Sequence, residues 1–250
     1  MNLLVISDLH LSPTSEHRTG QFLEFLENAW KNQDQVLIVG DLFDLWFGWP
    51  DLIMQFQKPI LSKMRELFSS GLKVDYVEGN RDFGIHHQEG ILFRRVVSRA
   101  WEGEWEGRKI HAEHGDLMNQ SDRPYRIWRR ISKNKISYFL ISHLPPIVTL
   151  RVGLRLEEKM RKTNQKNKIA YPEQSGRDFL LKMLHAGMDL VIVGHFHLEK
   201  TVQMQVASRN VLFYHLPGWE QGFRYLVIPA GKGIPYFTEW GKDNGNSATA

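Results

Sequence analysis

The sequence predicts an α/β fold, because short apolar runs alternate with amphipathic stretches along most of the chain. The apolar runs are rich in branched residues and begin at residues 3, 35, 72, 108 and 189. Two intervening segments, 21–30 and 59–71, place apolar residues at helical spacing, and the second opens with proline and closes on glycine, as helices do. This alternation favours a sheet that binds ligands at the carboxyl ends of its strands.

A different pattern follows Gly194. The runs 201–206, 210–215 and 224–229 are short and separated by turn residues. They predict antiparallel strands of a second sheet. We expect a single domain over residues 1–240, followed by a disordered polar tail at 241–250.

The composition limits the class of protein and the kind of metal site. With 250 residues, 42% of them hydrophobic and 24% charged, the chain has the composition of a soluble globular protein. It contains no cysteine, so a metal would have to be held by His, Asp, Glu or Asn. The longest apolar tract, 136–150, is too short to span a bilayer and contains two adjacent prolines. The sequence opens without a secretory signal pattern, so we expect a cytoplasmic protein.

Positive charge is concentrated in one segment. Residues 119–169 hold 13 Lys and Arg against three Asp and Glu, which gives a net charge of +10. Because the whole chain carries +4, the remainder carries −6. A basic, apolar insert in an acidic body favours a site for an anionic partner over general binding of nucleic acid.

Each of the five apolar runs ends in residues that can bind a metal. Asp8 and His10 follow the first run, and their spacing in an extended segment points both side chains the same way. The later runs end in "GDLFDLW", "GNRDF", "HGD" and "GHFH", which supply Asp41, Asn80, His114, His195 and His197. Alone, each residue is more simply explained as a turn or structural residue. Together, at strand ends that we expect to share one edge of one sheet, they favour a ligand cluster.

These seven residues exceed the four ligands of a tetrahedral zinc site and suit two metal ions that share a bridging ligand. Asp41 is the best bridge, because a carboxylate offers two oxygens and Asp41 lies between the other ligands in chain order. Two metal ions about 3.5–4 Å apart can bind a phosphoryl oxygen, generate hydroxide at neutral pH and stabilise in-line displacement. The mixture of Asp, Asn and His suits Mn²⁺ or Fe²⁺, with Zn²⁺ and Co²⁺ as alternatives.

The ordered series "DLH", "GD", "GNRD", "HGD" and "GHFH" resembles the calcineurin-like metallophosphoesterases, over roughly residues 1–230. The resemblance implies a β-sandwich flanked by helices, with the metal-bearing loops at one edge. It implies that one metal ion is held by Asp8, His10, Asp41 and His197, and the other by Asp41, Asn80, His114 and His195.

The resemblance also implies catalytic roles for Asp41, Asn80, Arg81 and His195. In many relatives a histidine follows the asparagine and assists the leaving group. Arg81 stands at that position here, which implies that it stabilises charge in the transition state.

Longer matches narrow the resemblance to one branch of the family. The segments "GDLFDLWFG", "GNRDF", "SDRPYR" and "RKTNQKNK" resemble the UDP-2,3-diacylglucosamine pyrophosphohydrolases of Gram-negative lipid A synthesis, which release UMP and lipid X. The substrate-binding residues implied by this resemblance are Arg81, Asp122, Tyr125, Asn164, Lys168 and His195. The branch usually has threonine between the last two histidines, where this chain has Phe196.

We expect a helical lid at about residues 122–170, in which cations and apolar residues alternate. Its cations include Arg126, Arg129, Arg130 and Lys133. Cationic donors beside apolar surface suit a substrate with a pyrophosphate and two acyl chains. The same surface suits peripheral binding to the anionic cytoplasmic face of the inner membrane. We expect no specific nucleic acid and no obligate protein partner.

Two other functions are open from the sequence. The same metal centre could hydrolyse a soluble phosphodiester or nucleotide, with Trp128 stacking on a base. Alternatively, the chain could be a non-catalytic module that binds membrane surfaces and uses a metal as a structural clip. Seven ligands disfavour this last reading, because structural sites usually close around four.

Overall fold

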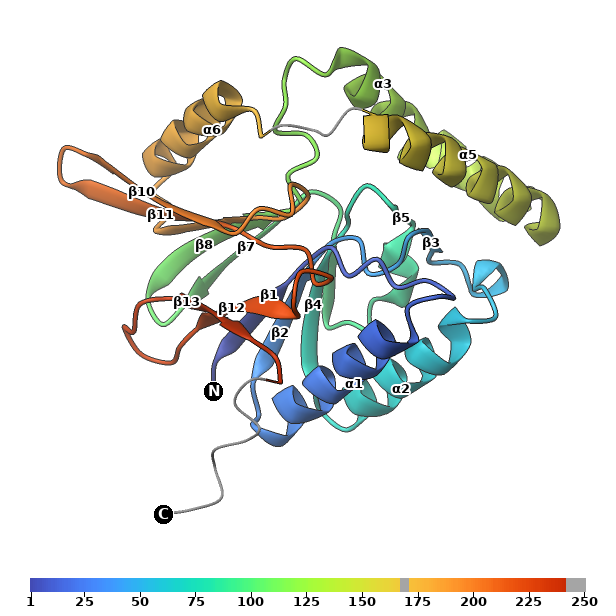
Figure 1. Ribbon diagram of the computed structural model, residues 1–250, viewed down its shortest axis with the longest axis horizontal. Helices are drawn as coiled ribbons and strands as arrows, with labels where there is room; N and C mark the ends of the chain where they lie inside the picture. Colours follow the sequence, from blue (N-terminus) through green and yellow to red (C-terminus); the bar gives the residue numbers. More distant parts are fainter. Residues whose placement is uncertain (167–170, 242–250) are drawn as a thin grey trace.

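Two β-sheets pack face to face and helices cover both outer faces, in a computed structural model that describes residues 1–166 and 171–241 (Figure 1). The predicted α/β class and the helix-flanked sandwich are both confirmed. The end of the expected lid and residues 242–250 of the expected tail lie outside the described residues.

The first sheet has the strand order β13-β12-β1-β2-β4-β6. Its strands are β1 (Leu3–Ile6), β2 (Gln35–Val39), β4 (Lys73–Val77), β6 (Arg95–Val97), β12 (Arg224–Ile228) and β13 (Tyr236–Glu239). The strands from β1 to β6 in this order run parallel, whereas β12 pairs antiparallel with β1, and β13 with β12.

The second sheet has the order β10-β11-β9-β8-β7. Its strands are β7 (Ala100–Trp105), β8 (Arg108–Glu113), β9 (Leu190–Val193), β10 (Lys200–Val206) and β11 (Arg209–His215). The parallel strands here are β8, β9 and β11. A further short pair is formed by β3 (Trp46–Phe47) and β5 (Asp82–Phe83).

The prediction that all three runs after Gly194 belong to a second sheet is wrong for the last one. The first two form the antiparallel pair β10 and β11 in the second sheet. The third forms β12, which joins the first sheet beside β1. Leu226 and Ile228 of β12 face the other sheet and Val227 faces the helices, so both faces of this strand are buried.

The apolar core has three layers, because both sheets are covered on both faces. Leu3 and Val5 of β1 pack between the sheets, while Leu4 and Ile6 pack against α1 (Glu16–Lys31) and α2 (Gln57–Ser69). On the far side, α6 (Glu173–His185) covers the second sheet. Burial on both faces explains why these strands are continuous apolar runs rather than alternating ones.

Three helices follow β8 and lie at one side of the sandwich, near the short pair β3 and β5 (Figure 1). They are α3 (Arg123–Ser132), α4 (Lys135–His143) and α5 (Pro146–Lys166), and we call them the cap. Tyr138, Ile141 and Leu150 of the cap pack against an apolar cluster that includes Phe47 and Phe83. Short 3₁₀ turns lie at Pro50–Leu52 (η1) and Ile85–Gln88 (η2). Among the described residues, no helix is long and apolar enough to cross a membrane.

Candidate metal centre

The seven predicted ligands meet at one end of the sandwich, in loops that follow the carboxyl ends of parallel strands. The first sheet supplies Asp8 and His10 after β1, Asp41 after β2 and Asn80 after β4. The second sheet supplies the remaining residues, His114 after β8 and His195 and His197 after β9. The expectation of one edge of one sheet is therefore wrong, because the cluster forms where the ends of two packed sheets converge.

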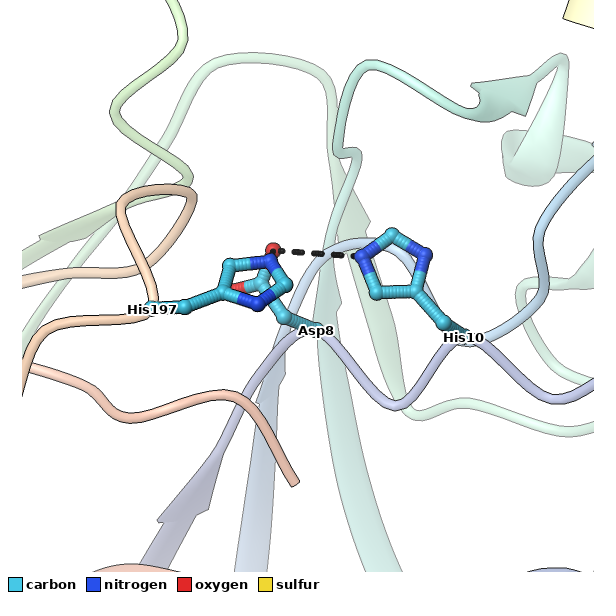
Figure 2. A group of neighbouring side chains, drawn as sticks. All are labelled: Asp8, His10 and His197. Atoms are coloured by element: carbon cyan, nitrogen blue, oxygen red, sulfur yellow. Dashed lines mark ion pairs between the residues drawn. The ribbon is translucent and has the colours of Figure 1, made fainter. Parts of the chain in front are cut away.

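One group of side chains surrounds Asp8 (Figure 2). The Oδ1 atom of Asp8 lies 3.3 Å from His197 Nε2 and 3.8 Å from His10 Nε2. The two imidazole rings stack with their centroids 5.3 Å apart. Their Nε2 atoms and the carboxylate thus face a common point.

A second group forms on the other side of Asp41. Asp41 Oδ2 lies 3.6 Å from His114 Nε2 and 4.0 Å from His10 Nε2, so this carboxylate stands between the two groups. Asn80 Oδ1 lies 2.9 Å from His114 Nε2 and 3.1 Å from His195 Nδ1. Ligand atoms of Asp8, Asp41 and His114 also lie within 4.8 Å of one another, so Asp8 is adjacent to both groups.

The residues at this centre fit divalent cations by their chemistry and by their burial. Asp8 and Asp41 are almost fully buried, and Asp8 Oδ1 has no hydrogen-bond partner. Two buried carboxylates side by side are costly unless positive charge compensates them. Imidazole, carboxylate and amide groups directed at one another form a ligand set for borderline and hard metals.

The protonation states of the side chains also bear on cation binding. Burial alone would raise the pKa of Asp8, but His114, His197 and His10 outweigh it and hold that pKa well below its usual range. Burial lowers the pKa of His195 to about 4, with His114 adding to the effect. For His197, burial alone would lower the pKa, but the carboxylates of Asp8 and Glu220 together outweigh it and raise the pKa to about 10. A cation that binds His197 at neutral pH must therefore displace its proton.

The backbone that carries the ligands is strained. Asp8, His10, Asp41, His195 and His197 all have φ between 48° and 68°, in the left-handed region that non-glycine residues rarely adopt. The loops that hold these conformations are bonded to one another: Asp8 N donates to Gly40 O, His10 N to Asp41 O, and His195 N to Asp8 Oδ2. This concentration of strain is typical of functional sites.

Glycine is required where these loops approach most closely. A Cβ at Gly79 would lie 2.2 Å from Asp41 Oδ1, and one at Gly194 would lie 2.8 Å from Asp8 Oδ2. The glycines of "GNRD" and "GHFH" therefore leave room for the carboxylates.

Asp82 connects two of the ligand loops, a role that the sequence did not reveal. Its Oδ2 atom accepts hydrogen bonds from Asp41 N at 3.0 Å, Gly79 N at 2.7 Å and Tyr76 Oη at 2.8 Å. Burial and the neighbouring Asp41 carboxylate raise the pKa of Asp82 to about 6. The last residue of "GNRD" thus fixes the backbone on both sides of the centre.

Arg81 lies directly beside Asp41. Its backbone N donates to Asp41 Oδ1 at 2.8 Å, its carbonyl accepts from Trp46 N at 3.0 Å, and the residue is buried. The backbone of the predicted charge-stabilising arginine is therefore fixed beside the ligand cluster by two hydrogen bonds.

The other residues predicted to bind substrate have varied positions. Asp122 caps α3 by accepting a hydrogen bond from Tyr125 N, and Tyr125 Oη donates to Asp116. His195 belongs to the metal centre. Asn164 falls in α5 where only the backbone is described, and Lys168 lies outside the described residues.

Two of the cations expected to border the substrate hold the cap in place instead. Arg129 is buried and forms an ion pair with Asp116 at 2.7 Å. Arg129 and Lys133 both donate to the carbonyl of Gly79, next to Asn80. This anchor fixes α3 on the "GNRD" loop. The sequence carried no signal for these contacts.

Phe196, where the resemblance implies threonine, lies between the two histidines of "GHFH". Its ring packs edge-on against Tyr171, 5.3 Å between centroids, and near the buried His215. The side chain therefore joins the apolar layer under α6.

Comparison with known proteins agrees with this geometry. The model of the calcineurin-like phosphoesterase family matches residues 1–199. The chain therefore belongs to the calcineurin-like phosphoesterases, a class of metal-dependent hydrolases that use divalent metal ions.

Curated relatives match nearly the whole chain. The UDP-2,3-diacylglucosamine hydrolase of Azotobacter vinelandii is 28% identical, covering 92% of this chain and 96% of its own. The enzyme of that name from Pseudomonas fluorescens is 29% identical over 92% of both chains. That from Vibrio vulnificus is 26% identical over 96% of this chain and all of its own.

Replacing Asp82 with alanine tests its connecting role. Three buried donors would lose their acceptor, so we expect Asp82→Ala to lower the free energy of unfolding of the metal-free protein by about 3–5 kcal/mol. Urea denaturation at pH 7.5 measures it, with the exposed Asp51→Ala as a control that changes stability by less than about 0.5 kcal/mol. A loss as small as that of the control would contradict the role.

Proposed function

We propose that the protein hydrolyses the pyrophosphate bond of UDP-2,3-diacylglucosamine to UMP and lipid X, using two divalent cations, with Mn²⁺ the best match to the ligands. The observation that carries the proposal is the pairing of a buried ligand cluster for phosphoester chemistry with a cap that exposes apolar side chains. The names of the curated relatives support this substrate.

The side chains of the centre have separate tasks in this proposal. Asp41, between the two ligand groups, would contribute its carboxylate to both cation sites. Asn80 and His195 would complete the second site. Arg81, whose backbone N donates to Asp41, would supply positive charge for the charge that develops on the phosphoryl oxygens. The chemistry that two bound divalent cations supply to such a centre is Lewis-acid activation of a phosphoryl oxygen and of water.

The cap supplies the part of the site that suits acyl chains. Its inner side packs through Tyr138, Ile141 and Leu150 onto the body. The cap also exposes a series of large apolar residues to solvent: Ile127, Ile131, Ile136, Phe139, Leu140, Leu144, Ile147, Val148, Val152 and Leu154. Apolar surface of this extent marks a binding face for lipid or protein. In our proposal the segment 122–170, of which the structure describes residues 122–166, is a lid beside the metal centre within one domain of residues 1–240.

Exposed cations stand next to these apolar residues along the same three helices. They include Arg126, Arg130, Lys135, Arg151 and Arg155. Cations around an apolar helical surface favour attachment to anionic lipid, so we propose peripheral association with the cytoplasmic face of the inner membrane, where a diacylated substrate would lie.

Release of UMP tests the proposed reaction. We expect the purified protein to release UMP from UDP-2,3-diacylglucosamine only when Mn²⁺ is present, and Asp41→Ala to be folded but nearly inactive, because it lacks the bridging carboxylate. Chromatographic quantification of UMP measures both. Hydrolysis of a soluble phosphodiester without release of UMP from UDP-2,3-diacylglucosamine would contradict the proposed substrate. Full activity of Asp41→Ala would contradict the bridging role of Asp41.

Substitutions on the cap test the acyl-binding face. We expect the double variant Phe139→Ser and Leu140→Ser to raise KM for the diacylated substrate about tenfold. An effect of this size corresponds to the loss of roughly one buried apolar contact with the acyl chains. Its kcat/KM for bis(p-nitrophenyl) phosphate should stay unchanged, because that small ester does not reach the cap. Ile234→Ser, at an exposed isoleucine outside the cap, serves as the matched control. Equal effects on both substrates would contradict an acyl-binding role.

A further inference from the structure

The loop between β11 and β12 lies against the metal centre, although it contains none of the ligand motifs. Trp219 N donates to the carbonyl of Asp8 at 3.3 Å, and the Trp219 ring is fully buried, edge-on to Phe25. A Cβ at Gly218 would lie 2.7 Å from His197 Nδ1. The backbone of this loop therefore passes along the side of the His197 ring that faces away from Asp8.

Glu220, the next residue of the loop, places its carboxylate beside the same ring nitrogen. Glu220 Oε1 lies 3.5 Å from His197 Nδ1, while His197 Nε2 faces Asp8 Oδ1 at 3.3 Å. The imidazole therefore stands between two carboxylates, one inside the metal centre and one outside it.

Arg18 of α1 links Glu220 to the first ligand loop. Its guanidinium lies 3.7 Å from Glu220 Oε2 and donates to the carbonyls of Leu9 and His10, each at 3.0 Å. A chain of contacts thus runs from His197 through Glu220 and Arg18 to the backbone of His10. It joins loops of the two sheets outside the ligand cluster.

The partner of one imidazole nitrogen decides which nitrogen is available to a metal ion. A carboxylate that accepts the Nδ1–H bond keeps the proton on Nδ1, leaves the Nε2 lone pair free and makes it more basic. His10 has the same arrangement, with Asp44 Oδ1 3.3 Å from its Nδ1 and Asp8 on the Nε2 side.

We propose that Glu220, held by Arg18, is a positioning residue of the metal centre: it orients His197 so that Nε2 points at the cation shared with Asp8. The inference rests on the proposed two-metal function and adds to it a residue outside the five motifs. Glu220 acts only through His197 and does not touch the reacting atoms.

Titration of the metal-free protein with Mn²⁺, following free Mn²⁺ by electron paramagnetic resonance, tests the proposal. We expect Glu220→Ala to weaken one of two Mn²⁺ sites about 10–100-fold and to leave the other within about threefold. Glu220→Gln should recover part of the affinity, because its amide oxygen can accept the Nδ1–H bond. Glu66→Ala, at a surface carboxylate paired with Lys63, is the control and should bind as wild type.

A double-mutant cycle separates positioning from a structural role. In a His197→Ala background, Glu220→Ala should have no further effect on Mn²⁺ affinity, because the imidazole through which Glu220 acts on the metal is absent. The Tm of metal-free Glu220→Ala should stay within about 3 °C of wild type, since the side chain is 44% exposed.

Two results would overturn the proposal: wild-type Mn²⁺ affinity at both sites in Glu220→Ala, or an equal weakening by that change in the His197→Ala background. These outcomes are distinct from a failure of the proposed function. A wild-type protein that binds two Mn²⁺ ions and responds to Glu220→Ala as expected, yet releases no UMP, would contradict the substrate and support the positioning role.

Discussion

The burial of two carboxylates, Asp8 and Asp41, against a set of histidines is the constraint around which the rest of the site is arranged. Both acids lie where the ends of two packed sheets converge, with Asp41 between the two ligand groups. Buried negative charges need close positive partners, which histidines and divalent cations supply. The left-handed backbone at the ligands, and the glycines that clear space for the carboxylates, are consequences of fitting so many ligands into one small volume.

The cap uses charged side chains to contact the ligand loops and exposes apolar side chains to solvent. Its inner face is tied to the ligand loops by charge, through the pair of Arg129 with Asp116 and the two cations on the Gly79 carbonyl. Elsewhere the cap exposes large apolar side chains, with exposed cations beside them along the helices. A fixed attachment beside Asn80, combined with an open apolar surface, suits a substrate whose phosphates must reach the metal centre while its acyl chains remain outside it.

Much of the fold, and the clustering of the candidate ligands, could be predicted because both depend on local patterns. Strands buried on two faces are continuous apolar runs, and ligands at the ends of parallel strands converge whichever sheet carries them. Pairing between distant segments leaves no such pattern. Examples are the position of β12 beside β1, the hydrogen bond from Arg129 to the Gly79 carbonyl and the approach of Glu220 to His197. An arginine in a basic helix has the same sequence signature whether it faces solvent or a buried carboxylate.

The central claim is that Asp41 stands between two cation sites, and anomalous diffraction from crystals of the Mn²⁺-loaded protein tests it most directly. The account predicts two anomalous peaks about 3.5–4 Å apart with the Asp41 carboxylate between them. One peak would belong with Asp8, His10 and His197, and the other with Asn80, His114 and His195. A single peak in the fully loaded protein, or two peaks that do not share Asp41, would contradict it.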